Sequence, residues 1–125
     1  MAKANHTIRL LLPLSLLAAT GCSYALNSKF TATAPYERSK RTPEQVEIFL
    51  RESPPSQPHT SVGIMEIILD SDAFSKSVPS NTELLSALRA AAAKNGLDGV
   101  RDVVFPPHGT YGYGTASGVG FVYAR

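Results

Sequence analysis

Cys22 is the only cysteine in a chain of 125 residues, which excludes both an intramolecular disulfide and a zinc site built from several thiolates. It closes a segment in which Lys3 and Arg9 precede an apolar run over residues 10–19, followed by small residues up to Gly21. A charged start, a short apolar run and small residues are typical of a secretory signal that is removed by cleavage. The run has about half the length that a membrane-spanning helix needs. The sequence therefore places Cys22 at a processing site.

The residues around this cysteine are more specific than a general export signal. Residues 17–22 are LAATGC, and this stretch resembles the lipobox of bacterial lipoproteins, with Ala19 where Leu is more usual. The resemblance implies cleavage between Gly21 and Cys22, diacylglycerol joined to the Cys22 sulfur by a thioether, and acylation of the new amino terminus. Two or more acyl chains hold a protein stably on a membrane. The alternative is a plain secretory signal with a coincidental cysteine.

The residue after Cys22 also bears on localisation. In enterobacterial lipoproteins an Asp at this place retains the protein in the inner membrane, and this chain has Ser23 instead. The resemblance therefore implies the periplasmic face of the outer membrane, with the membrane as partner through the lipid anchor.

The charge balance excludes nucleic acid as a partner. The chain has 12 Lys and Arg against 10 Asp and Glu, a formal charge of +2. Lys3 and Arg9 account for this excess and would leave with the signal, so the mature chain is neutral. Proteins that bind polyanions concentrate positive charge. Membrane attachment must then rest on lipid at Cys22.

The other residues of types that can bind metals are widely spaced along the sequence. His59 and His108 each stand alone in a proline-rich loop, without a second ligand at a metal-binding spacing. Asp70 and Asp72 lack the further oxygen ligands and the glycine of a calcium loop. No Gly-x-Ser-x-Gly motif is present. We therefore expect no metal, no cofactor and no enzymatic activity.

Tyr111 and Tyr113 are the candidate binding residues. They lie in HGTYGYGT, residues 108–115, where glycines alternate with the aromatic residues. Tyrosine offers a flat apolar ring with a hydroxyl tip, which suits contact with a glycan or a protein. The alternative is a hairpin loop whose tyrosines only cover the edge of a sheet.

The chain divides into a signal over residues 1–21, a flexible tether over 22–41 and a small domain over 42–125. The tether is rich in small and polar residues, although residues 30–33 have the composition of a short strand. Arg38, Lys40 and Arg41 form a basic patch near its end. This patch is either a contact for anionic lipid or part of a solvated linker.

The domain has the pattern of two strands, a helix and two strands. Branched and apolar residues predict strands over residues 46–50, 61–69, 99–105 and 116–124. The spacing of Ser80 and Glu83 predicts a helix start, and Asn95 followed by Gly96 predicts its end. A second capping signal, Thr42 to Gln45, predicts one helical turn. These elements predict an α+β fold of two layers, with one helix packed on a four-stranded sheet.

Several of these segments resemble a group of small bacterial envelope proteins. Residues 43–49, 62–64, 84–93 and 95–100 are similar to the Rcs-pathway stress-sensor lipoprotein of enteric bacteria and to YbjQ-like domains. The last segment departs from the family pattern, because Leu97 and Gly99 replace two alanines. The Rcs sensor carries disulfides in its folded domain, which this chain cannot form. The resemblance therefore implies the fold and not disulfide-dependent sensing.

Together these features predict a lipid-anchored, non-enzymatic protein of the bacterial envelope. Its role would be binding or sensing, with an envelope protein or peptidoglycan as partner. The alternative is a structural accessory lipoprotein of an envelope or cell-wall assembly.

Overall fold

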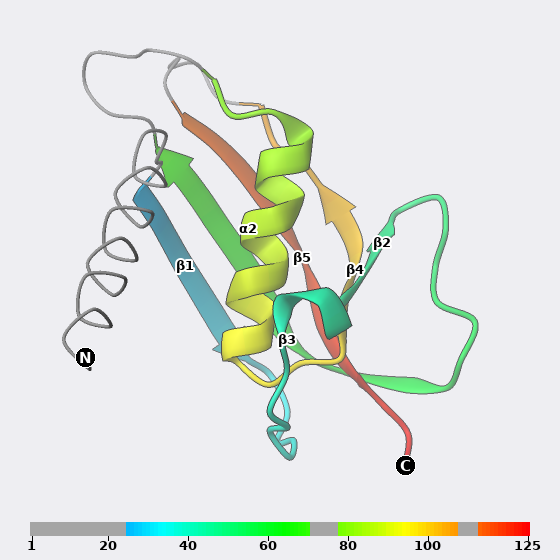
Figure 1. Cartoon of the computed structure of the whole chain (residues 1–125). Coiled ribbons are helices and arrows are strands. Elements are labelled where there is room, and N and C mark those ends of the chain that lie inside the picture. The colour runs from blue at the N-terminus through cyan, green and yellow to red at the C-terminus, as the bar shows by residue number, and fades with distance from the viewer. Residues whose placement is uncertain (1–24, 71–77, 108–112) are drawn as a thin grey trace, which may run out of the picture.

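One helix lies across one face of a β-sheet in the computed structural model, which describes residues 25–70, 78–107 and 113–125 (Figure 1). The elements are β1 (Ala25–Ala32), the short 3-10 helix η2 (Pro43–Gln45), β2 (Glu47–Leu50), β3 (His59–Asp70), α2 (Asn81–Lys94), β4 (Gly99–Val104) and β5 (Tyr113–Tyr123). The prediction of a two-layer α+β fold is confirmed.

The sheet has five strands, in the order β1-β3-β5-β4-β2. Neighbouring strands are antiparallel, except for β2 and β4, which are parallel. The prediction of four strands is therefore wrong. The additional strand is β1, which lies in the range that the sequence pattern assigned to the tether.

The side chains of β1 explain why its sequence gives a weak strand signal. Asn27, Ser28 and Lys29 separate its two large apolar residues, Leu26 and Phe30. The strand is instead fixed by its backbone, which pairs with β3 over its full length, from Ala25 opposite Asp70 to Ala32 opposite Gly63. An edge strand of this kind depends on pairing with its neighbour rather than on its own hydrophobicity.

A glycine in β3 lets β1 pack closely. A Cβ atom at Gly63 would lie 2.5 Å from both the Phe30 ring and the Thr31 carbonyl oxygen, too close for any other residue. The Phe30 ring also meets Tyr36 edge to face, with 5.9 Å between ring centroids. Phe30 therefore fastens β1 to the sheet and to the segment that follows it.

The two ends of the sheet differ in which elements begin or finish there. β1 and β5 begin, β3 finishes and α2 begins at what we call the upper end, which is marked by Ala25, Asp70 and Tyr113 (Figure 1). The lower end is marked by Ala32, by the His59–Tyr123 pair and by the C-terminus of α2.

Helix α2 has both of the predicted caps. The Ser80 hydroxyl accepts from the backbone N–H of Glu83 at 3.2 Å, and the Glu83 carboxylate accepts from the Ser80 N–H at 2.8 Å. At the other end Gly96 takes a φ of 71°. The backbone N–H groups of Gly96 and Leu97 then donate to Ala93 and Ala92, which is a Schellman ending. The capping box predicted for Thr42 and Gln45 is also present and starts η2.

The core lies between α2 and the sheet. Its largest fully buried side chains are Val62, Met65, Ile67, Leu88, Leu97 and Val100. On the helix, Ala91, Ala92 and Ala93 are buried. Their small side chains let the helix approach the strands closely, so one helix suffices to cover this face.

Asp98 joins three parts of the chain at the lower end. Its carboxylate accepts from Arg41 Nε, Arg125 Nη2 and the Tyr123 N–H at 2.7–2.9 Å, and only 4% of its side chain is exposed. Burial alone would raise the pKa of Asp98. The Tyr123 N–H and the guanidinium groups of Arg41 and Arg125 outweigh burial, so the pKa lies below its ordinary value.

The segment after β1 is held against the domain by the same region. The Tyr36 hydroxyl donates to the Asn95 carbonyl oxygen at 2.6 Å. The Arg38 guanidinium lies 5.9 Å from the centre of the Tyr36 ring, and Arg41 forms the ion pair with Asp98. Two members of the predicted basic patch thus have structural contacts.

Candidate functional site

The face of the sheet opposite α2 carries side chains that the core does not use. Successive residues of a strand point to opposite faces, and in β3 the contrast falls between neighbours. Ile67 is 1% exposed in the core, whereas Ile68 is 43% exposed on the other face. Within the described residues no helix packs on this open face.

The strand register arranges the open face in rows across β1, β3 and β5. From the upper end downward, the rows are Ala25–Asp70–Tyr113, Asn27–Ile68–Thr115, Lys29–Glu66–Ser117 and Thr31–Ile64–Val119. The middle strand, β3, therefore alternates carboxylates with isoleucines on this face, and most of the side chains beside them on β1 and β5 are polar.

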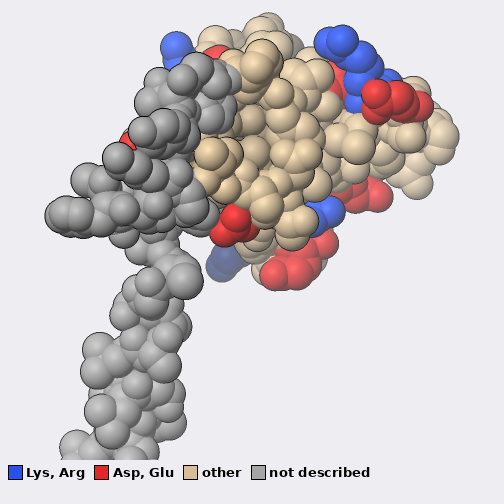
Figure 2. Space-filling model, turned by 90° about the horizontal axis from the view of Figure 1, so that it is seen from above, with Lys and Arg blue, Asp and Glu red and all other residues tan. Residues whose placement is uncertain are grey.

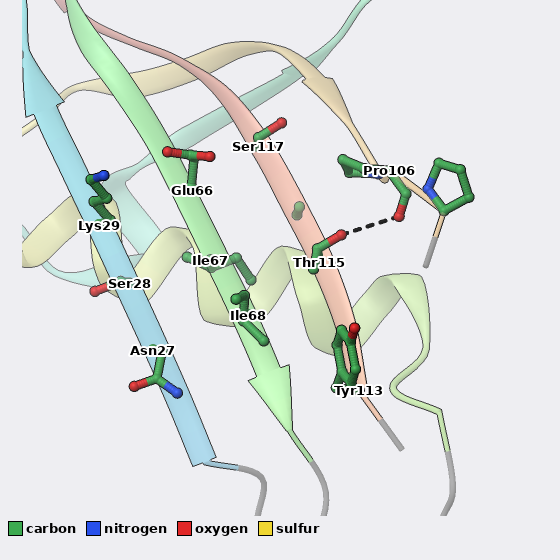
Figure 3. A pocket seen from close by; sticks show the side chains of 12 residues that line it. Asn27, Ser28, Lys29, Glu66, Ile67, Ile68, Pro106, Tyr113, Thr115 and Ser117 are labelled. Atoms are coloured by element: carbon green, nitrogen blue, oxygen red, sulfur yellow. Dashed lines mark hydrogen bonds between the residues drawn. The ribbon is translucent and has the colours of Figure 1, made fainter. Parts of the chain in front are cut away.

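The two middle rows, together with Tyr113, lie along an open groove of about 540 Å³ (Figure 3). Its lining residues are Asn27, Ser28, Lys29, Glu66, Ile67, Ile68, Pro106, Pro107, Tyr113, Thr115, Ala116 and Ser117. The segment after β4 forms one wall, and the Thr115 hydroxyl donates to the Pro106 carbonyl oxygen at 3.1 Å. The prolines restrict the backbone of this wall, so the groove is preformed.

Two opposite charges face each other across the groove floor. Lys29 of β1 and Glu66 of β3 are register partners. Within the part of the chain that the structure describes, neither forms an ion pair. Both charged groups are therefore available to a ligand, and each selects for the opposite charge.

The lower half of the same face is closed by an aromatic cluster of Phe49, His59, Phe121 and Tyr123. The Phe121 ring is fully buried and lies 5.0–6.0 Å from the other three ring centres. The Tyr123 hydroxyl donates to the Glu47 carboxylate. Burial and the hydrogen bond and charge of Glu47 raise the pKa of Tyr123 to about 12. This half is a second, small core.

Arg101 marks the boundary between the closed and open halves. A β-bulge in β4 places Asp102 at a φ of 54°, in the left-handed region. Arg101 pairs with Asp102 and donates to the Ser61 hydroxyl of β3 at 2.5 Å, which takes its side chain across β5.

The groove offers charges, hydrogen-bonding groups and apolar surface to a ligand. The groove residues comprise one carboxylate, one ammonium, hydroxyls and an amide around an aliphatic floor. Across residues 25–70, 78–107 and 113–125, no group of three or more His, Cys, Asp and Glu side chains could hold a metal ion. Over the same residues, no helix has the length and hydropathy to cross a membrane.

Of the residues predicted to act, the structure brings Tyr113 into the groove lining. Asp70 lies in the same row, at the end of β3. Gly21, Cys22, Asp72, His108 and Tyr111 lie outside the described residues, so their predicted roles stay predictions. His59 belongs to the aromatic cluster and contacts the Gln57 carbonyl oxygen at 2.8 Å through Nδ1.

Sequence reasoning missed most of the groove. Asn27 and Lys29 fell in the predicted tether, Glu66 and Ile68 were assigned to a strand without a role, and Thr115 was the last residue of the predicted loop over residues 108–115. One signal was available, because Glu66 is the single charge within the apolar run of β3. A lone charge in such a strand indicates that the strand has a solvent-facing side.

Comparison with known proteins bears on the fold. Neither a family model nor a curated protein sequence matches the chain. A solved structure does match, the orthorhombic crystal form of the Francisella virulence factor FvfA, with a TM-score of 0.51 and 16% sequence identity. The alignment covers 77% of this chain and 97% of that one. The two proteins therefore share a fold.

Proposed function

We propose that this chain is a non-enzymatic, lipid-anchored protein of the bacterial envelope that binds a protein partner in the groove on the open face of its sheet. The observation that carries the proposal is this preformed groove. Its apolar floor residue Ile68 is 43% exposed although it lies in β3, a strand with a neighbouring strand on each side. The binding role could include sensing, if occupancy of the groove is passed to a signalling partner.

The lipid anchor is supported by the sequence around Cys22. The lipobox-like LAATGC follows a charged and apolar segment of the right length, and it contains the one thiol of the chain. Ser23 favours the periplasmic face of the outer membrane. FvfA is described as a virulence factor. The envelope role proposed for this chain rests on its own signal sequence and not on that description.

A polypeptide is a better match to the groove than a glycan. Protein interfaces combine an apolar centre with a polar rim, and here an Ile68 floor is flanked by Lys29, Glu66 and Tyr113. The facing charges of Lys29 and Glu66 add specificity for a partner segment that carries both signs. Peptidoglycan remains the competing ligand that the experiment must distinguish.

Metabolic labelling with a fatty acid tests the anchor. The full-length chain should incorporate the label, and Cys22→Ala should lose it. Equal labelling of both chains would contradict lipidation at Cys22.

Site-specific photocrosslinking tests the groove. A photoreactive residue at position 68 should give a discrete adduct in cells, whereas the same residue at Ser86, exposed on α2, should give none. Lys29→Glu should weaken the adduct several-fold by removing the charge pattern. Equal adducts from both positions would contradict a partner in the groove. If the protein sediments with purified peptidoglycan and Ile68→Asp abolishes this sedimentation, the ligand of the groove is peptidoglycan and not a protein.

A further inference from the structure

The start of β1 determines how the domain sits on a membrane, if the lipid anchor proposed above is present. Only Ser23 and Tyr24 separate Cys22 from Ala25, the first residue of β1. Three residue steps span at most about 11 Å, even in an extended chain. Covalent geometry therefore allows at most about 11 Å between the Cα atoms of Cys22 and Ala25, with the thioether one short side chain further.

We propose that the upper end of the sheet is a membrane-docking surface that rests on the headgroups of a phospholipid bilayer. A lipid held so close to β1 leaves little room for any other orientation, and Ala25, Asp70 and Tyr113 share the row nearest to it. The occupant of this surface is the bilayer that receives the acyl chains.

The exposed apolar side chains of this end suit the interface. Leu26 lies one residue from the start of β1, and Val78 lies just before the cap of α2. Their exposed fractions are 42% and 52%. Side chains of this kind favour the boundary between headgroups and acyl chains. In Figure 2, which looks onto the upper end, the visible surface beside the grey residues is largely uncharged, and the charged residues gather toward its rim.

The charged residues argue against docking through anionic lipid. Arg38, Arg41, Lys94 and Arg125 lie at the lower end, around Asp98 and the C-terminus of α2. The eight residues of β1 make seven steps and separate the two ends by about 23 Å. The basic patch therefore points away from the bilayer, and docking should depend little on salt or on anionic lipid.

The sole cysteine makes this orientation measurable. Once its thiol is consumed in the thioether, Val78→Cys and Lys94→Cys each provide one free thiol, at an exposed site at the upper and the lower end respectively. The lipidated full chain carrying a fluorophore at either site is placed in phosphatidylcholine vesicles whose headgroups bear a spin-label quencher. The label at position 78 should be quenched several-fold more than the label at position 94, in low and in high salt.

Equal quenching at the two positions overturns the proposal, and so does quenching that high salt removes. A chain with a linker of about twenty Gly and Ser residues inserted before Ala25 is the matched control. It keeps both labels and the lipid but frees the domain, and its label at position 78 should lose most of the quenching. Intact mass separates the two hypotheses. Unmodified Cys22 overturns the anchor and the docking together, whereas lipidated chain with equal quenching overturns docking alone.

Discussion

The two faces of the sheet are built from the same strands but differ in how far their side chains are buried. On the face toward α2, side chains of β3 and β5 are buried against the helix, and on the opposite face alternate residues of those strands line a groove. Ile67 and Ile68 are adjacent, of the same type and both at the groove, yet Ile67 is buried in the core and Ile68 is 43% exposed. The difference shows that burial, rather than residue type or strand position, separates residues that stabilise the fold from residues available to a partner.

Truncating Ile67 and Ile68 to alanine, one at a time, should give the largest difference in stability between the two faces. Ile67→Ala removes a fully buried side chain and leaves a cavity, which should lower the free energy of unfolding by about 2–4 kcal/mol. Ile68→Ala removes a side chain that is already half in water and should cost less than about 1 kcal/mol. Urea unfolding followed by circular dichroism measures both. Equal losses would mean that the groove floor is part of the core.

A pair of glycine substitutions tests the attachment of β1. Gly63→Ala forces its Cβ against the Phe30 ring and the Thr31 carbonyl, so β1 should separate from β3 at a cost of about 1–3 kcal/mol. Gly114→Ala is the control, because its Cβ would meet the flexible end of Leu84 at 3.3 Å and Pro79 at an ordinary contact distance of 3.6 Å.

Hydrogen exchange locates the effect of these two variants. The amides of β1 should lose protection in Gly63→Ala, while those of β5 and α2 keep it. Undiminished protection of β1 would show that Phe30 can rearrange, and that the strand is not fastened by this contact.

Replacing Asp98 tests how much a buried charged group contributes to the free energy of unfolding. Asp98→Asn keeps the size and removes the charge that Arg41 and Arg125 share, which should cost about 1–2 kcal/mol because half of the Arg125 side chain is exposed. The folded pKa lies below the ordinary 3.8, so this contribution is present above about pH 4. It is lost as the pH falls through the lowered pKa.

Unfolding measured from about pH 6 to about pH 2 checks the sign. The wild-type chain and Asp98→Asn should converge in acid. A gap that stays constant over the whole range would show that the charge of Asp98 is not what the cluster needs.

The smallest predicted effect is a change in the pKa of Tyr123, in the aromatic cluster at the lower end of the sheet. The Tyr123 hydroxyl should ionise near pH 12, above the ordinary 10.0, because burial and Glu47 both favour its neutral form. Glu47→Gln should lower that pKa toward the ordinary value. The difference in ultraviolet absorbance between the chain and Tyr123→Phe across an alkaline titration isolates this residue. Ionisation near 10 would mean that the aromatic cluster is open to solvent like the groove.

The parts of the structure that the sequence predicted well are those set by local chemistry. The Ser80–Glu83 capping box, the Gly96 ending and the Thr42–Gln45 turn each depend on residues a few positions apart, and all three are present. Strands β2 to β5 were found because apolar and branched residues dominate them.

The parts that the sequence could not predict depend on distant pairing. β1 is a strand because its backbone pairs with β3, and its own polar residues do not announce it. The groove depends in turn on β1, since Asn27 and Lys29 form one side of it. Tyr113 was identified from its aromatic type alone, but the residues beside it become neighbours only through the strand register.

The strand order also sets an order in time. β1 joins the sheet only through β3, while η2, β2 and the proline-rich connector lie between them along the chain, and β2 occupies the opposite edge. Closing so long a loop is slow compared with forming local contacts. A chain made from its N-terminus therefore carries β1 unpaired until β3 has been synthesised.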